Sequence, residues 1–209
     1  MRHRPALSTA LAAALLTTLL AAPALAESTF VGGIEGMLGF PGGYSNDGSA
    51  ESTTDVVRTN IQEGDLDTSF GLVPWVEQKL GDVVGFGGEV MFVWMGADHE
   101  KERRLVLSPH LRVRMAFPII DKVTFDAFLA GGPSIWSATD GTTNRSQVND
   151  TDGWRFGWSL RFGFGGSYAI NDSVSVYSHL GWYTTTTYGD DITANRQTVP
   201  LCVGLRGNF

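Results

Sequence analysis

The feature that most limits the possible folds of this chain is a two-residue alternation of bulky apolar side chains with small or charged ones. In residues 154–164 every even position is Trp, Phe or Leu, and every odd position is Arg, Gly or Ser. Residues 105–117 repeat the pattern, with Ser108, His110, Arg112 and Arg114 on the polar side. Neighbouring residues of a β-strand point to opposite faces, whereas a helix would scatter both sets around its axis. Both segments are therefore predicted to be strands with one apolar and one polar face.

Six further segments alternate in the same way, so the sequence predicts an all-β fold with eight antiparallel strands. These segments are residues 30–40, 70–76, 84–94, 123–135, 174–182 and 199–209. Residues 70–76 alternate least well, because Val73 and Trp75 interrupt the polar face and Pro74 has no amide hydrogen to donate to a ladder.

The connections between the predicted strands alternate in length. Short ones lie at residues 80–82, 119–122 and 171–173, and long polar ones at 41–67, 96–104, 137–152 and 184–196. Short turns at one end and long loops at the other are typical of barrels in the bacterial outer membrane, whose short turns face the periplasm. We therefore predict an up-and-down barrel with both ends of the domain on the periplasmic side.

The N-terminus has the layout of a cleaved signal peptide. Arg2, His3 and Arg4 precede an apolar run over residues 11–22 and the small-residue site Ala24-Leu25-Ala26. The apolar run is shorter than the roughly 20 residues that a membrane helix needs. We predict a signal peptide over residues 1–26 and one barrel domain over residues 27–209.

Composition excludes several classes of function. Loss of Arg2 and Arg4 with the signal would change the formal charge from −7 to −9, and nucleic-acid binding requires a basic surface. Cys202 is the one cysteine, so an internal disulfide is impossible and a zinc cluster is unsupported. We predict no cofactor, no metal and no nucleic-acid partner.

The identity of the two faces decides between a soluble and a membrane barrel. The interior of an eight-stranded barrel is just wide enough for its own side chains, and the apolar face here is too bulky to fit inside. An Arg that faced lipid would cost about 2–4 kcal/mol at the membrane midplane. We therefore expect the polar face to line the lumen as an ion-pair network without a wide pore. Its predicted members are Glu35, Glu77, Glu89, His110, Arg112, Arg114, Asp126, Arg155, Arg161, His179 and Arg206.

Amphipathic aromatic rings favour the two membrane interfaces, and seven of them lie near predicted strand ends. We expect interfacial positions for Trp75, Trp94, Trp136, Trp154, Trp182, Tyr168 and Tyr183.

Taken together, the signal peptide, the eight alternating segments and the aromatic C-terminus resemble the small outer-membrane barrels of the OmpA/OmpX/OmpW type. In that family the last strand and its final Phe are the recognition signal for the barrel-assembly machinery, and Leu201, Val203, Leu205 and Phe209 match it. The resemblance implies a monomer in the bacterial outer membrane, with outer-membrane lipids and the assembly machinery as partners.

The sequence leaves the activity open among several classes. A structural or surface-interaction protein with four acidic loops is our first expectation, and a narrow channel for small solutes is the second. A lipid-modifying enzyme would need Ser108 or another nucleophile beside His110, with Asp126 and His179 as other candidates; Pro109 separates the pair and no nucleophile elbow is present. We expect no enzyme activity. A soluble lipid-binding barrel is the fourth alternative.

Overall fold

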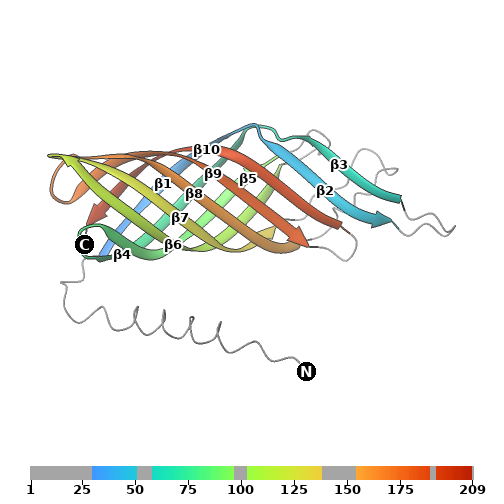
Figure 1. Ribbon diagram of the computed structural model, residues 1–209, viewed down its shortest axis with the longest axis horizontal. Helices are drawn as coiled ribbons and strands as arrows, with labels where there is room; N and C mark the ends of the chain where they lie inside the picture. Colours follow the sequence, from blue (N-terminus) through green and yellow to red (C-terminus); the bar gives the residue numbers. More distant parts are fainter. Residues whose placement is uncertain (1–29, 51–57, 97–102, 138–153, 189–191, 209) are drawn as a thin grey trace, which may run out of the picture.

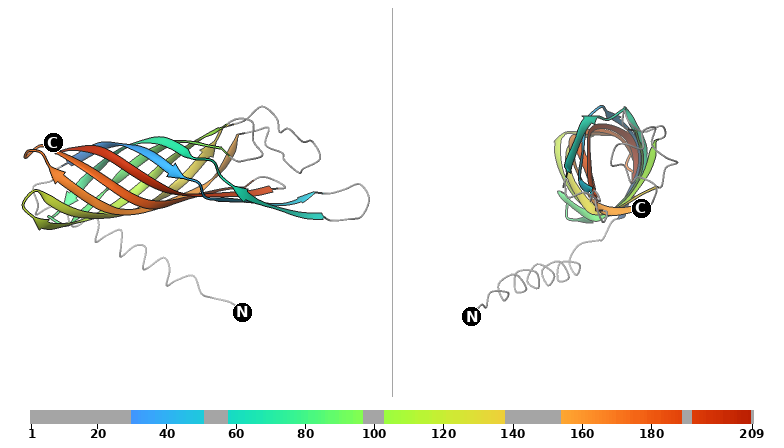
Figure 2. Two further views of the ribbon diagram at one scale, coloured as in Figure 1. Left: turned by 90° about the horizontal axis from the view of Figure 1, so that it is seen from above. Right: turned by 90° about the vertical axis from the view of Figure 1, so that its right-hand side faces the viewer.

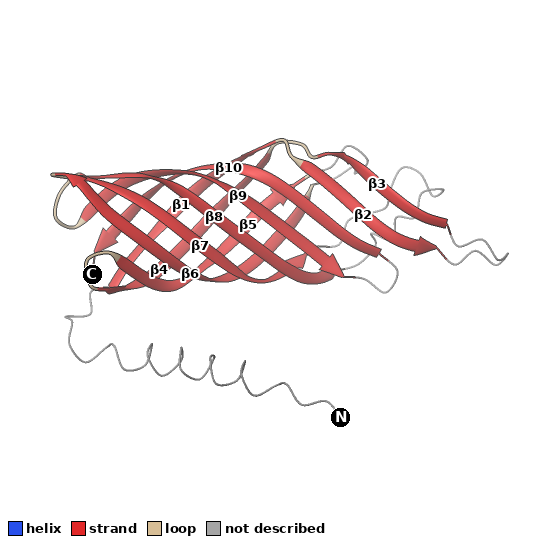
Figure 3. Cartoon of the chain, in the orientation of Figure 1, coloured by secondary structure: helices blue, strands red, loops and turns tan. Residues whose placement is uncertain are grey.

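The computed structural model describes residues 30–50, 58–96, 103–137, 154–188 and 192–208, and the side chains of these residues apart from 46–64 and 192. The described residues form ten strands and no helix that is long and apolar enough to cross a membrane (Figure 3). The strands are β1 (Phe30–Phe40), β2 (Gly43–Ala50), β3 (Arg58–Asp65), β4 (Ser69–Leu80), β5 (Val84–Met95), β6 (Arg104–Ile120), β7 (Val123–Trp136), β8 (Arg155–Ala169), β9 (Val174–Tyr188) and β10 (Ile192–Asn208). The predicted signal peptide and Phe209 lie outside the described residues.

Eight of these strands close into a barrel. Each pairs antiparallel with its neighbour in the order β1-β4-β5-β6-β7-β8-β9-β10, and β1 then pairs with β10 from Val31↔Asn208 to Phe40↔Val199. Figure 1 shows the steeply tilted strands from the side, and the right-hand view of Figure 2 shows the ring that they form. The predicted eight-stranded antiparallel barrel is therefore confirmed.

The prediction that residues 41–67 form a loop is wrong. It contains the hairpin β2–β3, and β2 pairs with β10 from Ile192↔Gly48 to Arg196↔Tyr44. This pairing lies beyond the point where β1 ends at Phe40, so the hairpin extends the wall past the rest of the barrel, as Figure 1 shows.

The predicted loop 184–196 is also mostly strand. The run Thr184–Thr187 continues β9, and β10 begins at Ile192. Threonine favours extended backbone because it is β-branched, and here the ladder continues to Thr193↔Tyr188. The alternation missed this extension, because it depends on the contrast between an apolar and a polar face, and these residues are polar on both.

Tight turns connect the strands at the opposite end. Gly81 after β4 and Lys122 after β6 have positive φ values of 75° and 68°. The side chain of Asn171 closes the β8–β9 connection, with Oδ1 accepting the amide hydrogens of Ser173 and Val174 at 2.9 Å each. Because short turns of outer-membrane barrels face the periplasm, we call this end of the barrel the periplasmic end.

The two faces of the wall are oriented as the charge argument predicts. Leu111 is 67% exposed and Phe156 is 64% exposed on the outer surface, whereas the adjacent Arg112 has no exposed area. The lumen has two layers. Most of the charged side chains fill the half nearer the periplasmic end, and an apolar layer including Met91, Val93 and Trp136 lies nearer the loop end, where Arg104 and Arg196 are also buried.

Candidate functional site: the charged lumen

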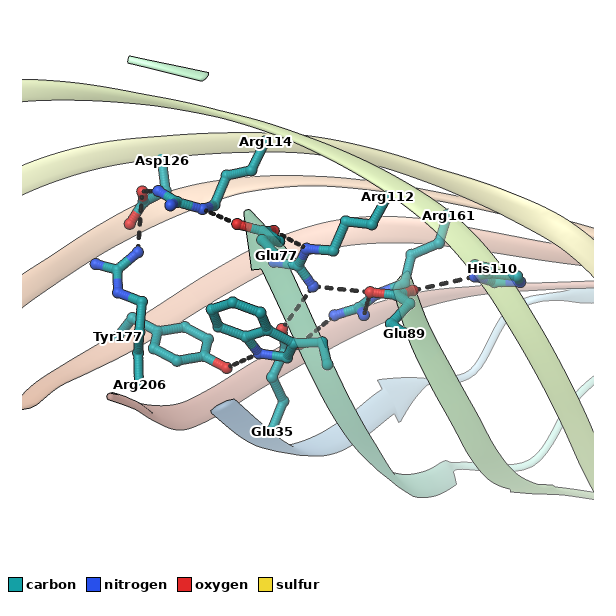
Figure 4. A network of polar contacts seen from close by, with 11 residues as sticks. Glu35, Glu77, Glu89, His110, Arg112, Arg114, Asp126, Arg161, Tyr177 and Arg206 are labelled. Carbon is teal, nitrogen blue, oxygen red and sulfur yellow. Dashed lines mark hydrogen bonds and ion pairs between the residues drawn. The ribbon is translucent and has the colours of Figure 1, made fainter. Parts of the chain in front are cut away.

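Strand β6 supplies the central part of the charged layer. His110, Arg112 and Arg114 occupy alternate positions, so all three side chains point into the lumen. The carboxylates that meet them come from other strands: Glu35 from β1, Glu77 from β4, Glu89 from β5 and Asp126 from β7. Figure 4 shows these groups converging from different sides of the barrel.

Arg112 lies at the centre of the network. Its Nε donates to Oε1 of Glu77 at 2.8 Å, and its Nη1 donates to Oε1 of Glu35 at 3.0 Å and to Oε2 of Glu89 at 2.7 Å. The guanidinium carbon lies 4.8 Å from the ring centroid of Trp75 and 4.3 Å from that of Phe128. The two rings fix the plane of the guanidinium, while the three carboxylates compensate its charge.

Glu89 accepts from three residues. Oε2 is shared by Arg112 and by Nη1 of Arg161 at 3.0 Å, and Oε1 lies 3.0 Å from Nδ1 of His110. Arg161 also forms an ion pair with Glu35 and donates to Sγ of Cys202 at 3.2 Å. Glu89 therefore connects three positively charged or polar partners on two strands.

A second group of ion pairs lies toward the periplasmic end. Arg114 donates through Nε to Oε2 of Glu77 at 2.7 Å and through Nη1 to Oδ1 of Asp126 at 2.8 Å. Arg206 reaches the same oxygen of Asp126 at 3.5 Å and donates to Oγ of Ser167 at 2.7 Å. Across the lumen, four arginines thus face four carboxylates, which neutralises buried charge that would otherwise be costly.

Two predicted members of the network lie outside it. Arg155 begins β8, six residues and about 20 Å along the strand from Arg161, so it is at the loop end of the barrel. His179 does face the lumen, but its contacts there are aromatic: its ring centroid lies 5.0 Å from that of Tyr177 and 5.1 Å from that of Phe128. Residue type and strand parity do not determine how far along the barrel axis a side chain lies or which partner it contacts. The position along the axis excludes Arg155 from the network, and the choice of partner excludes His179.

Three of the aromatic residues expected at the membrane interfaces are in the lumen instead. Trp75, Trp136 and Tyr183 are 6%, 1% and 0% exposed. Trp75 donates its Nε1 hydrogen to the hydroxyl of Tyr177 at 2.6 Å, a pair that the sequence reasoning did not identify. Strand parity could have found it, because Trp75 has the same parity as Glu77 on β4.

The lumen also contains a serine, a histidine and a glutamate in a chain of contacts. Nε2 of His110 lies 2.7 Å from Oγ of Ser159, and its Nδ1 contacts Glu89. The sequence had suggested Ser108 as the partner of His110, but Ser108 lies 3.2 Å from the hydroxyl of Tyr183 instead. Ser108 and His110 belong to one strand, and residues two apart on a strand are spread along it, whereas Ser159 faces His110 from β8.

A closed antiparallel barrel with a continuous apolar outer face and a charge-compensated interior defines a transmembrane β-barrel of the outer-membrane type. Residues 12–199 match the family model of the outer membrane protein beta-barrel domain, and the chain belongs to this family. Its location in the bacterial outer membrane follows from that membership. The match begins inside the segment predicted to be the signal peptide, so the boundary at residue 27 stays a prediction.

A solved structure with a TM-score above 0.5 shows the same fold at low sequence identity. Neisserial surface protein A is 13% identical, with a TM-score of 0.52 over 88% of this chain and 100% of that one. OprG from Pseudomonas aeruginosa is 11% identical, with a TM-score of 0.43 over 87% and 95%. Ail of Yersinia pestis is 10% identical, with a TM-score of 0.41 over 87% and 99%. No curated protein sequence matches this chain significantly.

Proposed function

We propose that this protein is a non-conducting outer-membrane anchor that presents a β-sheet and acidic loops to a partner at the cell surface. The observation that carries the proposal is the hairpin β2–β3, which continues the wall beyond Phe40 by pairing with the first residues of β10. A sheet that extends past the barrel is unnecessary for anchoring in the membrane.

The extended sheet offers a specific mode of recognition. β3 is the last strand in the sheet order, and among the described residues it pairs with β2 alone. The outer edge of such a strand carries unpaired amide and carbonyl groups that can bind an extended segment of another protein. The connections 97–102, 138–153 and 189–191 carry acidic residues in the sequence, such as Asp98, Asp150 and Asp190, which would favour a basic partner.

The contents of the lumen support an anchor over a channel. The charged layer binds its own guanidinium and carboxylate groups to one another, and the apolar layer above it includes Trp136 and Tyr183. A permeating ion would have to displace the buried ion pairs and then pass the large side chains packed nearer the loop end, such as Trp136 and Tyr183. Purified protein in planar bilayers is expected to give no resolved conductance steps, and regular steps would favour the channel.

Adjacent proline substitutions in β3 test the edge directly. In an antiparallel ladder the amide hydrogen of one residue points to the partner strand and that of the next points away, so one of Ile61→Pro and Gln62→Pro opens the hairpin while the other blocks only the free edge. Attachment of cells that express each variant to a lawn of the same bacterium, and to host-cell monolayers, is compared with wild type. Both variants should reduce attachment at least severalfold. NMR should show that only the variant that blocks the free edge keeps the contacts between β2 and β3. Unchanged attachment in both contradicts the proposal.

A hydrolase is the second candidate, because Ser159, His110 and Glu89 are arranged as a nucleophile, a base and an orienting acid. Two observations oppose it. Ser159 is only 6% exposed, and Oε2 of Glu89 is held by Arg112 and Arg161, which already compensate the charge of this carboxylate. A fluorophosphonate probe is therefore expected to leave Ser159 unlabelled in folded protein. Labelling that Ser159→Ala abolishes would instead establish an activated serine.

A further inference from the structure

The periplasmic mouth of the lumen contains a cavity that neither the barrel anchor nor the surface sheet requires. Its volume is about 190 Å³, and it lies where β4, β6 and β10 end. Lys79, Arg114 and Arg206 line it with Asp82, Ser175 and Asn208. Three cationic side chains therefore face one carboxylate.

The cations at this cavity retain donors. Arg114 uses Nε and Nη1 on Glu77 and Asp126, and within the described part of the chain its Nη2 meets no acceptor. Lys79 has no hydrogen bond or ion pair among the described residues, and its ammonium is repelled by Arg114 and Arg206 while Asp82 attracts it. The carboxylates that compensate the arginines, Glu77 and Asp126, are fully buried behind them.

We propose that this cavity binds a phosphate-class oxyanion. Such a ligand would accept from Nη2 of Arg114 and from the Lys79 ammonium, and it would relieve the repulsion between the two. The hydroxyl of Ser175 adds a neutral donor on the opposite wall. The volume accommodates one phosphate group with water. Figure 4 shows Arg114 and Arg206 reaching Asp126 from two sides, which fixes both guanidinium groups before a ligand arrives.

Two sources could supply this chemistry at the periplasmic end. One is free inorganic phosphate in the periplasm, and the other is the headgroup of a phospholipid in the inner leaflet, whose phosphate lies at the same depth as the short turns. Pro118, which lines the cavity, is exposed at the end of β6, so a ligand at the periplasmic end of the barrel can reach the cavity.

The test uses the full mature barrel refolded in dodecyl maltoside, which contains no phosphate. Isothermal titration calorimetry measures binding of inorganic phosphate and, separately, of dihexanoyl phosphatidylglycerol. Lys79→Gln should weaken binding about tenfold, and Lys79→Arg should retain it. Lys122→Gln is the matched control, because Lys122 is exposed at the same end of the barrel but does not line the cavity.

A second variant keeps the test informative even if Lys79→Gln fails to fold. Asp82→Asn removes the one carboxylate of the lining and should tighten binding two- to threefold. Binding of phosphate identifies the free anion, and binding of the lipid alone identifies the headgroup; both support the site. The proposal is overturned if neither ligand binds wild type, or if Lys79→Gln and Lys122→Gln bind alike.

Discussion

Arg161 on β8 and Glu89 on β5 meet in the lumen at 3.0 Å, although two strands separate them around the barrel wall. Neither side chain has a neighbour in sequence that could compensate its charge. The pair exists because closure of the barrel brings the two walls within reach of two long side chains, and Arg112 from β6 completes the contact on the same oxygen of Glu89.

Removal of the Glu89 charge should destabilise the barrel strongly. Glu89→Gln leaves Arg112 and Arg161 short of a carboxylate in a buried position, and loss of one partner of a buried pair costs about 3–5 kcal/mol. Urea unfolding in lipid vesicles, followed by tryptophan fluorescence, measures the free energy of unfolding. Asp121→Asn at an exposed turn is the control and should change it by less than about 0.5 kcal/mol. An equal effect of both variants would contradict the assigned role of Glu89.

Each of the two layers of the lumen should block the passage of ions on its own. Truncation of Glu35, Glu89, Arg112 and Arg161 to Ala keeps the charge balanced and removes the ion pairs at the centre of the polar layer, but the apolar layer should still block ions. Trp136→Ala with Tyr183→Ala alone should also remain closed, because the ion pairs persist. The combined variant should show discrete conductance steps in planar bilayers. Steps from the polar truncation alone would show that the apolar layer is no barrier.

Glycine at position 33 should be required by the packing of Trp75. A Cβ at Gly33 would lie 2.8 Å from the indole Cζ2 and 2.5 Å from the carbonyl oxygen of Leu205, so Gly33→Ala should cost about 1–3 kcal/mol. Gly36 on the same strand has no atom closer than the carbonyl oxygen of Val203 at 3.8 Å, so Gly36→Ala should be nearly neutral. Heat-modifiability on gels compares the two, and a reversed order would contradict the observed Trp75 position.

The stability cost of a charge on the outer face should show whether lipid or water surrounds the barrel. Leu111→Arg places a guanidinium on the outer surface midway along β6 and should cost about 2–4 kcal/mol in lipid vesicles. Phe156→Arg, at the loop end of β8, should cost no more than about 1 kcal/mol. Equal and negligible costs at both positions would indicate that water surrounds the barrel.

Much of this architecture could be predicted from local pattern. In a barrel wall each residue must face either lipid or lumen, so the parity of Arg112 and Arg114 on β6 already placed them inside. The same rule applied strictly to β4 would have put Trp75 beside Glu77. The inward position of Trp75 was missed because Val73 and Trp75 are apolar residues on the inward face. They weaken the contrast between an apolar and a polar face on which the prediction depends.

The sequence alone therefore determined the number of barrel strands, the face that meets lipid and the presence of charge inside, because all three follow from a period of two and the cost of charge in hydrocarbon. Tertiary structure decided which charges meet. Strand register and closure set the height of each side chain, so that His110 contacts Ser159 rather than Ser108, and Arg155 lies at the loop end of β8, far from Arg161. It also decided that β2 and β3 continue the sheet beyond the barrel, because a strand that is polar on both faces is stabilised by its ladder partners and leaves no amphipathic pattern.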